Sequence, residues 1–220
     1  MSSPRLLNKR THGIGRAPDF PRLLSGRLCL DFVNTIEGPI SPEPEDFLID
    51  YASLARWSWH AGAIDDEQWT ELDQLASSSP EEARAVFARA VQVRGTLERL
   101  FRAIARGDAP ARDDLEVLHA EHIDALRAAS LQRHGGRMRW SWSSVNDLRL
   151  PLWLVVNSAF ELLTDGDMTR IRQCPGADDC GWLFYDMSRN GTRRWCSMEG
   201  CGSRVKMRRL YERRRVSTAT

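Results

Sequence analysis

Four of the five cysteines of the 220-residue chain fall in one short stretch near its C-terminal end. Cys174 and Cys180 are separated by five residues, Cys196 and Cys201 by four, and fifteen residues lie between the two pairs. This spacing is typical of a zinc site, because each pair supplies two thiolates from one tight turn and the intervening segment brings the turns together. Four protein ligands leave no open coordination position, so the sequence predicts one structural zinc ion rather than a catalytic one.

Two other uses of these thiols stay open at this point. Two disulfides are one alternative, but a fifth cysteine, Cys29, makes the number odd, and the N-terminus lacks the apolar segment of a secretory signal. An iron–sulfur cluster is the other, since it also takes four thiolates. We favour zinc, because a module of about 45 residues buries little apolar surface and gains most from a metal.

Basic residues crowd the same stretch. Residues 170–220 carry a net charge of +7 and residues 1–169 a net charge of −6, although the whole chain sums to only +1. Guanidinium and ammonium groups suit phosphate oxygens and base edges, so the asymmetry predicts a nucleic-acid partner. The alternative is that the basic end docks on the acidic remainder of the chain.

The candidate nucleic-acid contacts lie within or just after the cysteine pairs. Arg204 is the candidate for reading a base, because it stands at the start of the predicted last helix, and the distal Arg213 to Arg215 would add a looser attraction. The full set of candidates is Arg189, Arg193, Arg194, Arg204, Lys206, Arg208 and Arg209.

The elements that must position these residues follow from local patterns. "CPGADDC" contains proline and glycine for a turn, "WLFYD" is apolar enough for a strand, and Asn190-Gly191 is a strong hairpin signal. After Cys201 the spacing becomes helical, with Val205, Met207, Leu210 and Tyr211 as its expected packed side, and Cys201 is expected in the first turn. The sequence thus predicts a treble-clef-like zinc finger made of a β-hairpin and a helix.

Upstream, helical patterns dominate. A helix is expected from about Phe47 to the turn at 60–63, another after an Asp65 cap, and a long one from Ser79 and Pro80 to Gly107. Two more are expected from Pro110 to about residue 134 and from Pro151 to Leu163.

Two strands are also expected in this part of the chain. Leu28, Leu30 and Phe32 alternate with Cys29 and Asp31, which predicts a strand within residues 25–35. A second alternating run, residues 137–142, would pair with the first. The fold class is therefore α+β: a mostly α-helical N-terminal domain with a small β-sheet, followed by the finger.

The chain divides at a change of charge sign. We expect a flexible basic tail over residues 1–24, a helical domain over residues 25–168 and the finger over residues 169–216, with "TDGDM" as the linker. No run is long and apolar enough to suggest a membrane span.

The stretch "SRNGTRRWCSMEGCGSRVKMRRLYERRR" resembles the CGNR zinc finger of bacterial proteins. Cys201, Gly202 and Arg204 match the family's Cys-Gly-Asn-Arg, whereas Ser203 replaces its asparagine, and serine caps helices equally well. "GRLCLDFVNT", residues 26–35, is similar to the opening motif of the ABATE domain that accompanies this finger. The resemblance implies stress-induced transcription regulators, with DNA binding by the finger and the four cysteines as metal ligands.

Our leading interpretation is a cytoplasmic, bacterial, DNA-binding transcription regulator. Its N-terminal domain would either sense a signal, such as a small-molecule ligand, or mediate assembly. The alternatives are an RNA-binding protein and a protein–protein adaptor with a purely structural zinc. An enzyme ranks last: Asp31 and Asn34 are polar residues in an apolar motif that either face a ligand pocket or cap a turn, and GxGxxG, P-loop, HExxH and GxSxG motifs are all missing.

Overall fold

The computed structural model describes residues 20–38, 40, 41, 43–142, 147–176 and 180–217. The predicted tail, residues 1–24, lies outside the described part except for residues 20–24. Its elements in chain order are α1 (Leu28–Val33), β1 (Ile36–Glu37), β2 (Glu45–Asp46), α2 (Tyr51–His60), α3 (Asp66–Ser78), α4 (Pro80–Arg106), α5 (Arg112–Arg127), β3 (Ser130–His134), β4 (Arg137–Ser141), α6 (Leu150–Asp165), η1 (Met168–Arg170), β5 (Ile171–Gln173), β6 (Leu183–Tyr185), η2 (Met198–Gly202) and α7 (Ser203–Ser217).

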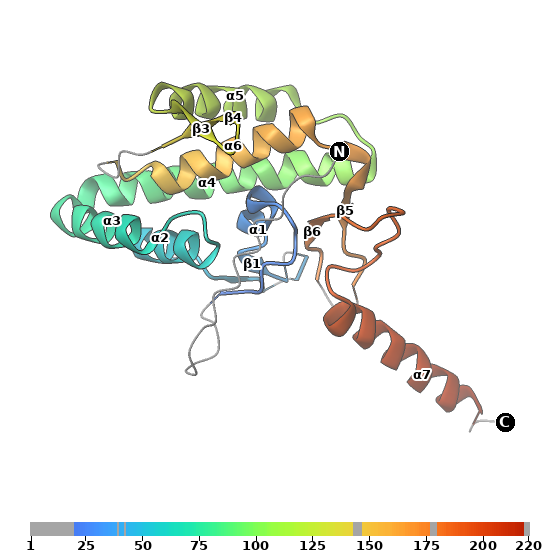
Figure 1. The fold of residues 1–220 in the computed structure, drawn as a ribbon. Coiled ribbons are helices and arrows are strands. Elements are labelled where there is room, and N and C mark those ends of the chain that lie inside the picture. The colour runs from blue at the N-terminus through green and yellow to red at the C-terminus, as the bar shows by residue number, and fades with distance from the viewer. Residues whose placement is uncertain (1–19, 39, 42, 143–146, 177–179, 218–220) are drawn as a thin grey trace.

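The long helix α4 runs through the middle of the N-terminal domain (Figure 1). Pro80 occupies its first turn and Gly107, at φ 84°, ends it in the left-handed conformation, both as predicted. Ser79 precedes the helix without a side-chain capping bond. Its buried side chains recur at helical spacing, so one face of α4 lies against the core along most of its length.

The other helices pack around α4. Helix α5 packs against α4 and α6, whereas α2 and α3 pack against each other and against α4. The capping box predicted at Asp65 is confirmed, because Asp65 accepts from the Gln68 N–H and the Gln68 side chain accepts from the Asp65 N–H. Helix α2 starts later than predicted, at Tyr51, because Asp50 and Ser53 form a capping box of their own.

The strand expected within residues 25–35 is wrong: residues 28–33 form the short helix α1. This helix packs against both α4 and α6, so Cys29, Leu30, Phe32 and Val33 are all buried. A helix that is enclosed on several sides lacks the polar face that reveals a helical period in the sequence. A short apolar run therefore fits a strand equally well, which is why the prediction was wrong.

The strand predicted near residues 137–142 is confirmed as β4, but the expected partner is wrong. β4 pairs antiparallel with β3, with His134 opposite Arg137. The two glycines between them, Gly135 and Gly136, have φ values of 54° and 81°, as a tight hairpin turn requires. Residues 130–134 therefore form a strand, and the predicted helix ends at Arg127, before the hairpin.

The C-terminal part begins with an antiparallel pair, β5 and β6, which encloses the first cysteine pair. The predicted hairpin at Asn190-Gly191 is only a turn: Gly191 has φ 62° and donates to the Ser188 carbonyl, without flanking paired strands. Ile171, Leu183 and Tyr185 join the core of the N-terminal domain, and β5 packs on α4 while β6 packs on α1. The fold class is thus confirmed as a mostly α-helical domain with small sheets, followed by a strand–helix finger.

Candidate metal centre and nucleic-acid interface

The four thiols of the finger converge on one point. The Sγ atoms of Cys174, Cys180, Cys196 and Cys201 all lie within 4.8 Å of one another, and Cys196 Sγ is 3.6 Å from both Cys180 Sγ and Cys201 Sγ. A disulfide needs sulfurs about 2.05 Å apart, and all five cysteines are free thiols. Four buried sulfurs at these separations match a tetrahedral metal site.

Each pair is shaped by its own turn. The Cys174 N–H donates to the Trp182 carbonyl at 2.8 Å, which extends the β5–β6 pairing to the first ligand. In the second turn the Ser197 hydroxyl accepts from the Gly200 N–H, and this opens η2 ahead of Cys201. Cys201 therefore lies in the turn just before α7 rather than in the first turn of that helix, where the sequence predicts it.

The electrostatics of the cluster call for a cation. Hydrogen bonds from the side chains of Cys180 and then Cys196 lower the pKa of Cys174, whereas the same contacts raise the pKa values of Cys180 and Cys196. Of these three thiols, only Cys174 is favoured as a thiolate by the mutual arrangement. Four thiolates can share the volume only around a positive ion, and a closed tetrahedron of four sulfurs suits structural zinc.

The Arg193 side chain is engaged in hydrogen bonds that stabilise the second cysteine turn. Its guanidinium donates to the carbonyls of Trp195, Cys196 and Leu24, and it lies 4.5 Å from the ring centroid of Phe184. The bonds to Trp195 and Leu24 are 3.0 and 2.8 Å long. Arg193 thus positions the metal-binding turn, and its nucleic-acid contact stays a prediction that this geometry weakens.

Arg204 also contacts the metal site. One of its terminal nitrogens lies 3.7 Å from Cys201 Sγ, and the side chain lines a cleft of about 380 Å³ together with Cys180, Trp182 and the 197–201 turn. An N–H donated to a thiolate stabilises its negative charge. The base-reading role expected for Arg204 remains a prediction beside this contact.

Helix α7 leaves the finger and extends away from the rest of the molecule (Figure 1). Val205 is its buried anchor, but Met207, Leu210 and Tyr211 are 46%, 40% and 57% exposed, so the packed side predicted for this helix is wrong. The basic side chains on this helix that are described, Arg204, Lys206, Arg208 and Arg209, are all exposed, and so is Arg189 on the preceding turn. The side chains of residues 213–217 lie outside the described set.

The two polar residues of the opening motif, Asn34 and Asp31, bond to backbone groups of other segments. Asn34 hydrogen-bonds to both backbone groups of Leu183 in β6. Asp31 accepts from the Ser25 N–H at 2.9 Å, and burial raises the pKa of its carboxyl to about 6. Neither residue lines the cleft of about 380 Å³ beside the zinc site or a second cleft of about 260 Å³.

Sequence reasoning missed Arg172. It is exposed and lines a cleft of about 260 Å³ beside Arg194, on the strand side of the zinc site. The available signal was its spacing: Arg172 precedes Cys174 by two residues, as Arg194 precedes Cys196.

Within the described residues, every helix is too short or too polar to cross a membrane.

Two family models match the chain. The model named ABATE, described as "Putative stress-induced transcription regulator", matches residues 26–166, and the CGNR zinc finger model matches residues 170–214. A search of curated proteins finds no match. Both resemblances expected from the sequence motifs are confirmed. The finger model and the four clustered cysteines together assign one structural zinc ion, in preference to disulfides or an iron–sulfur cluster.

Proposed function

Since the chain belongs to the ABATE family and carries a CGNR zinc finger, we propose that it is a DNA-binding transcription regulator. In this proposal the finger binds DNA in the cytoplasm, and the helical domain senses a signal or mediates assembly. The domain division at residues 168 and 169 is part of the proposal, as is the absence of enzymatic activity.

The observation that carries the proposal is that helix α7 is basic, is mostly exposed and begins directly after the zinc site. Only Val205 among its described side chains is buried, so packing on the helical domain does not explain the helix. A helix without a buried apolar stripe gains little stability from tertiary contacts. Its exposed Lys206 and Arg209, one turn apart, are free to reach phosphate oxygens.

The zinc site adds rigidity at the point where α7 begins. Cys201 is a ligand candidate two residues before Ser203, and Val205, in the first turn of α7, is buried. Side chains on a rigid element lose less freedom on binding than side chains on a loose tail. We therefore expect the first two turns of α7 to contribute most of the affinity, chiefly through phosphate contacts.

Binding of labelled duplex DNA, structured RNA and single strands, measured by fluorescence anisotropy over a range of salt concentrations, tests this function. We expect duplex DNA to bind with the steepest salt dependence. The variant Lys206→Ala/Arg209→Ala should reduce the salt slope of log K by about 0.9 for each phosphate that the variant no longer neutralises. Alanine is a strong helix former, so α7 is retained.

Arg137→Ala/Arg139→Ala is a charge-matched control, because both arginines are exposed on β4 of the helical domain. Its binding should equal that of the wild type. Preference for structured RNA over duplex DNA would move the RNA-binding interpretation to first place. Binding to none of the three nucleic acids would favour the adaptor interpretation.

A further inference from the structure

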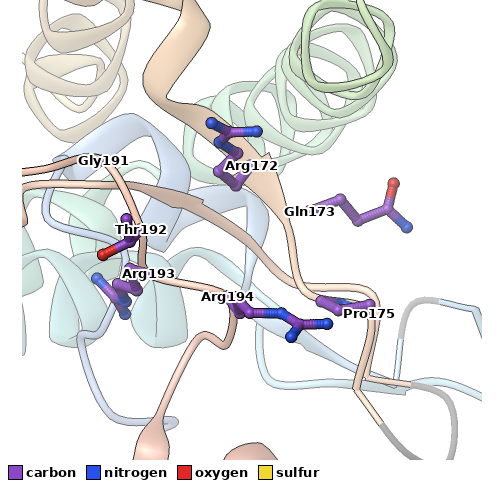
Figure 2. Close-up of a pocket in the computed structure, with 7 residues that line it drawn as sticks. All are labelled: Arg172, Gln173, Pro175, Gly191, Thr192, Arg193 and Arg194. Atoms are coloured by element: carbon purple, nitrogen blue, oxygen red, sulfur yellow. The ribbon is translucent and has the colours of Figure 1, made fainter.

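The cleft of about 260 Å³ lies between two segments that lead into the two halves of the zinc site. One segment is Arg172-Gln173-Cys174 and the other is Arg194-Trp195-Cys196, so each half is preceded by an arginine at the same spacing. Figure 2 shows the residues that line this cleft. They are Arg172, Gln173, Pro175, Gly191, Thr192, Arg193 and Arg194.

The positions of the two arginines are fixed by the scaffold. Arg172 pairs with Phe184 in the β5–β6 register, and Phe184 is fully buried. Arg194 directly follows Arg193, which is bonded to three backbone carbonyls, and its guanidinium lies 5.8 Å from the centroid of the Trp195 ring. Both guanidinium groups are nevertheless exposed. The cleft thus presents two positive charges from a rigid base.

The lining carries no negative charge. Gln173 and Thr192 are neutral hydrogen-bonding residues, and acidic side chains are missing from the residues that form the cleft. Arg193 is already engaged with backbone carbonyls, which leaves Arg172 and Arg194 as the cations available to a ligand. Among the side-chain bonds and ion pairs found in the described residues, neither of these two arginines has a carboxylate partner. An anion rich in oxygen atoms, such as a phosphate, fits this combination.

The directions of the two side chains distinguish a chain of phosphates from a single one. Figure 2 shows that the side chains of Arg172 and Arg194 leave separate segments and extend in different directions. Two guanidinium groups that point in different directions cannot both bind one small anion. Each can instead contact a different phosphate along a nucleic-acid backbone. We propose that the Arg172–Arg194 cleft binds the sugar–phosphate backbone of duplex DNA, as a second contact surface of the finger in addition to α7. This inference rests on the proposed function.

The test compares the full-length, zinc-loaded protein with Arg172→Ala/Arg194→Ala in duplex-DNA titrations at several salt concentrations. We expect the salt slope of log K to fall by about 1.8 in the double variant, roughly 0.9 for each phosphate left without its arginine. Arg172→Lys/Arg194→Lys retains both charges and should keep the wild-type slope. Zinc content and circular dichroism should match the wild type in both variants, since both side chains are exposed.

Inorganic phosphate is titrated into the wild type in parallel, by calorimetry. We expect no saturable binding at millimolar concentrations; saturable binding that the alanine pair abolishes would make the cleft a site for a free phosphate and overturn the inference. An unchanged slope in the alanine pair, while Lys206→Ala/Arg209→Ala lowers it, would overturn the inference and leave the proposed function intact. If the slope falls as far in the lysine pair as in the alanine pair, charge is not the cause and the inference fails. A wild type that binds no DNA would instead remove the proposed function itself.

Discussion

The side-chain amide of Asn34 bridges both backbone groups of Leu183. Its Nδ2 donates to the Leu183 carbonyl at 2.8 Å, and its Oδ1 accepts from the Leu183 N–H at 3.0 Å. Asn34 follows α1 in the helical domain, whereas Leu183 lies in β6 of the finger. The amide therefore pairs the edge of β6 in the way a neighbouring strand would, and couples the two parts of the chain.

Asn34→Ala should destabilise the protein and loosen the finger. The substitution leaves two buried backbone groups of Leu183 without partners, and each unsatisfied group costs about 1–3 kcal/mol. We expect a lower free energy of unfolding in urea and faster loss of zinc to a chelator. Asn157→Ala is the matched control, because Asn157 lies on α6 and its amide bonds to the side chains of Glu161 and His122 rather than to backbone groups. Equal stability of Asn34→Ala and the control would show that the bridge is not a structural link.

Asp31 predicts a pH dependence of stability. Burial raises its pKa in the folded protein to about 6, above the ordinary value of 3.8. The folded state therefore holds this proton more tightly than the unfolded state, so the stabilising contribution is fully present below pH 4 and is lost as the pH rises through 6. The difference corresponds to about 3 kcal/mol.

Asp31→Asn removes this titration. We expect the free energy of unfolding of the wild type to fall relative to that of the variant between pH 4 and pH 6, measured by urea denaturation at each pH. Comparison at equal pH cancels the effect of acid on the zinc thiolates, which both proteins share. Parallel pH profiles for the two proteins would contradict the raised pKa.

Cys201→Ser should abolish stoichiometric zinc binding. Structural zinc contributes roughly 10–16 kcal/mol of apparent binding free energy, and one missing thiolate opens the tetrahedron. Elemental analysis should give about one zinc per chain in the wild type and far less in the variant. Cys29→Ser is the matched control: Cys29 is fully buried in the helical domain, and burial raises the pKa of its thiol to about 12. Its zinc content should stay at the wild-type level.

Gly176→Ala should weaken zinc binding without removing a ligand. A methyl group at residue 176 would lie 2.7 Å from Cys180 Cβ and 3.0 Å from Cys201 Sγ, so the first turn must move away from the site. We expect faster zinc transfer to a chromogenic chelator. Gly200→Ala, in the second turn, meets Ser197 only at an ordinary 3.5 Å and should behave like the wild type. Identical transfer rates for the two variants would mean that the first turn accommodates the methyl group.

Limited proteolysis tests whether the two parts that meet near residue 168 are independent units or are held together by the finger. The Asp167 N–H donates to the Tyr185 hydroxyl, and Arg170 donates to the carbonyls of Asp186 and Ser188. These bonds tie the segment that connects the helical domain to the finger onto the finger itself. We expect residues 164–168 to resist cleavage with zinc bound and to be cut after chelation, when the finger loosens. A stable fragment of about 140–170 residues from the zinc-bound protein would instead show two independent units.

The helical patterns and the cysteine spacing were readable from local chemistry. The Asp65–Gln68 capping box, Pro80, and Gly107 each act within a few residues, so their effects do not depend on distant parts of the chain. The same holds for the two cysteine turns. The helix α1 was misassigned because its surroundings, and not its own periodicity, decide its conformation.

By itself, the sequence determined the fold class, the metal ligands and the basic character of the finger, because each depends on residue types at short spacing. Only the tertiary structure decided how these parts are used. It turned Arg193 inward to three backbone carbonyls, left Arg172 and Arg194 exposed around a cleft, and set Asn34 against a strand 149 residues away. Such roles depend on which groups meet after folding, and hydrogen bonds between distant segments leave no periodic signal along the chain.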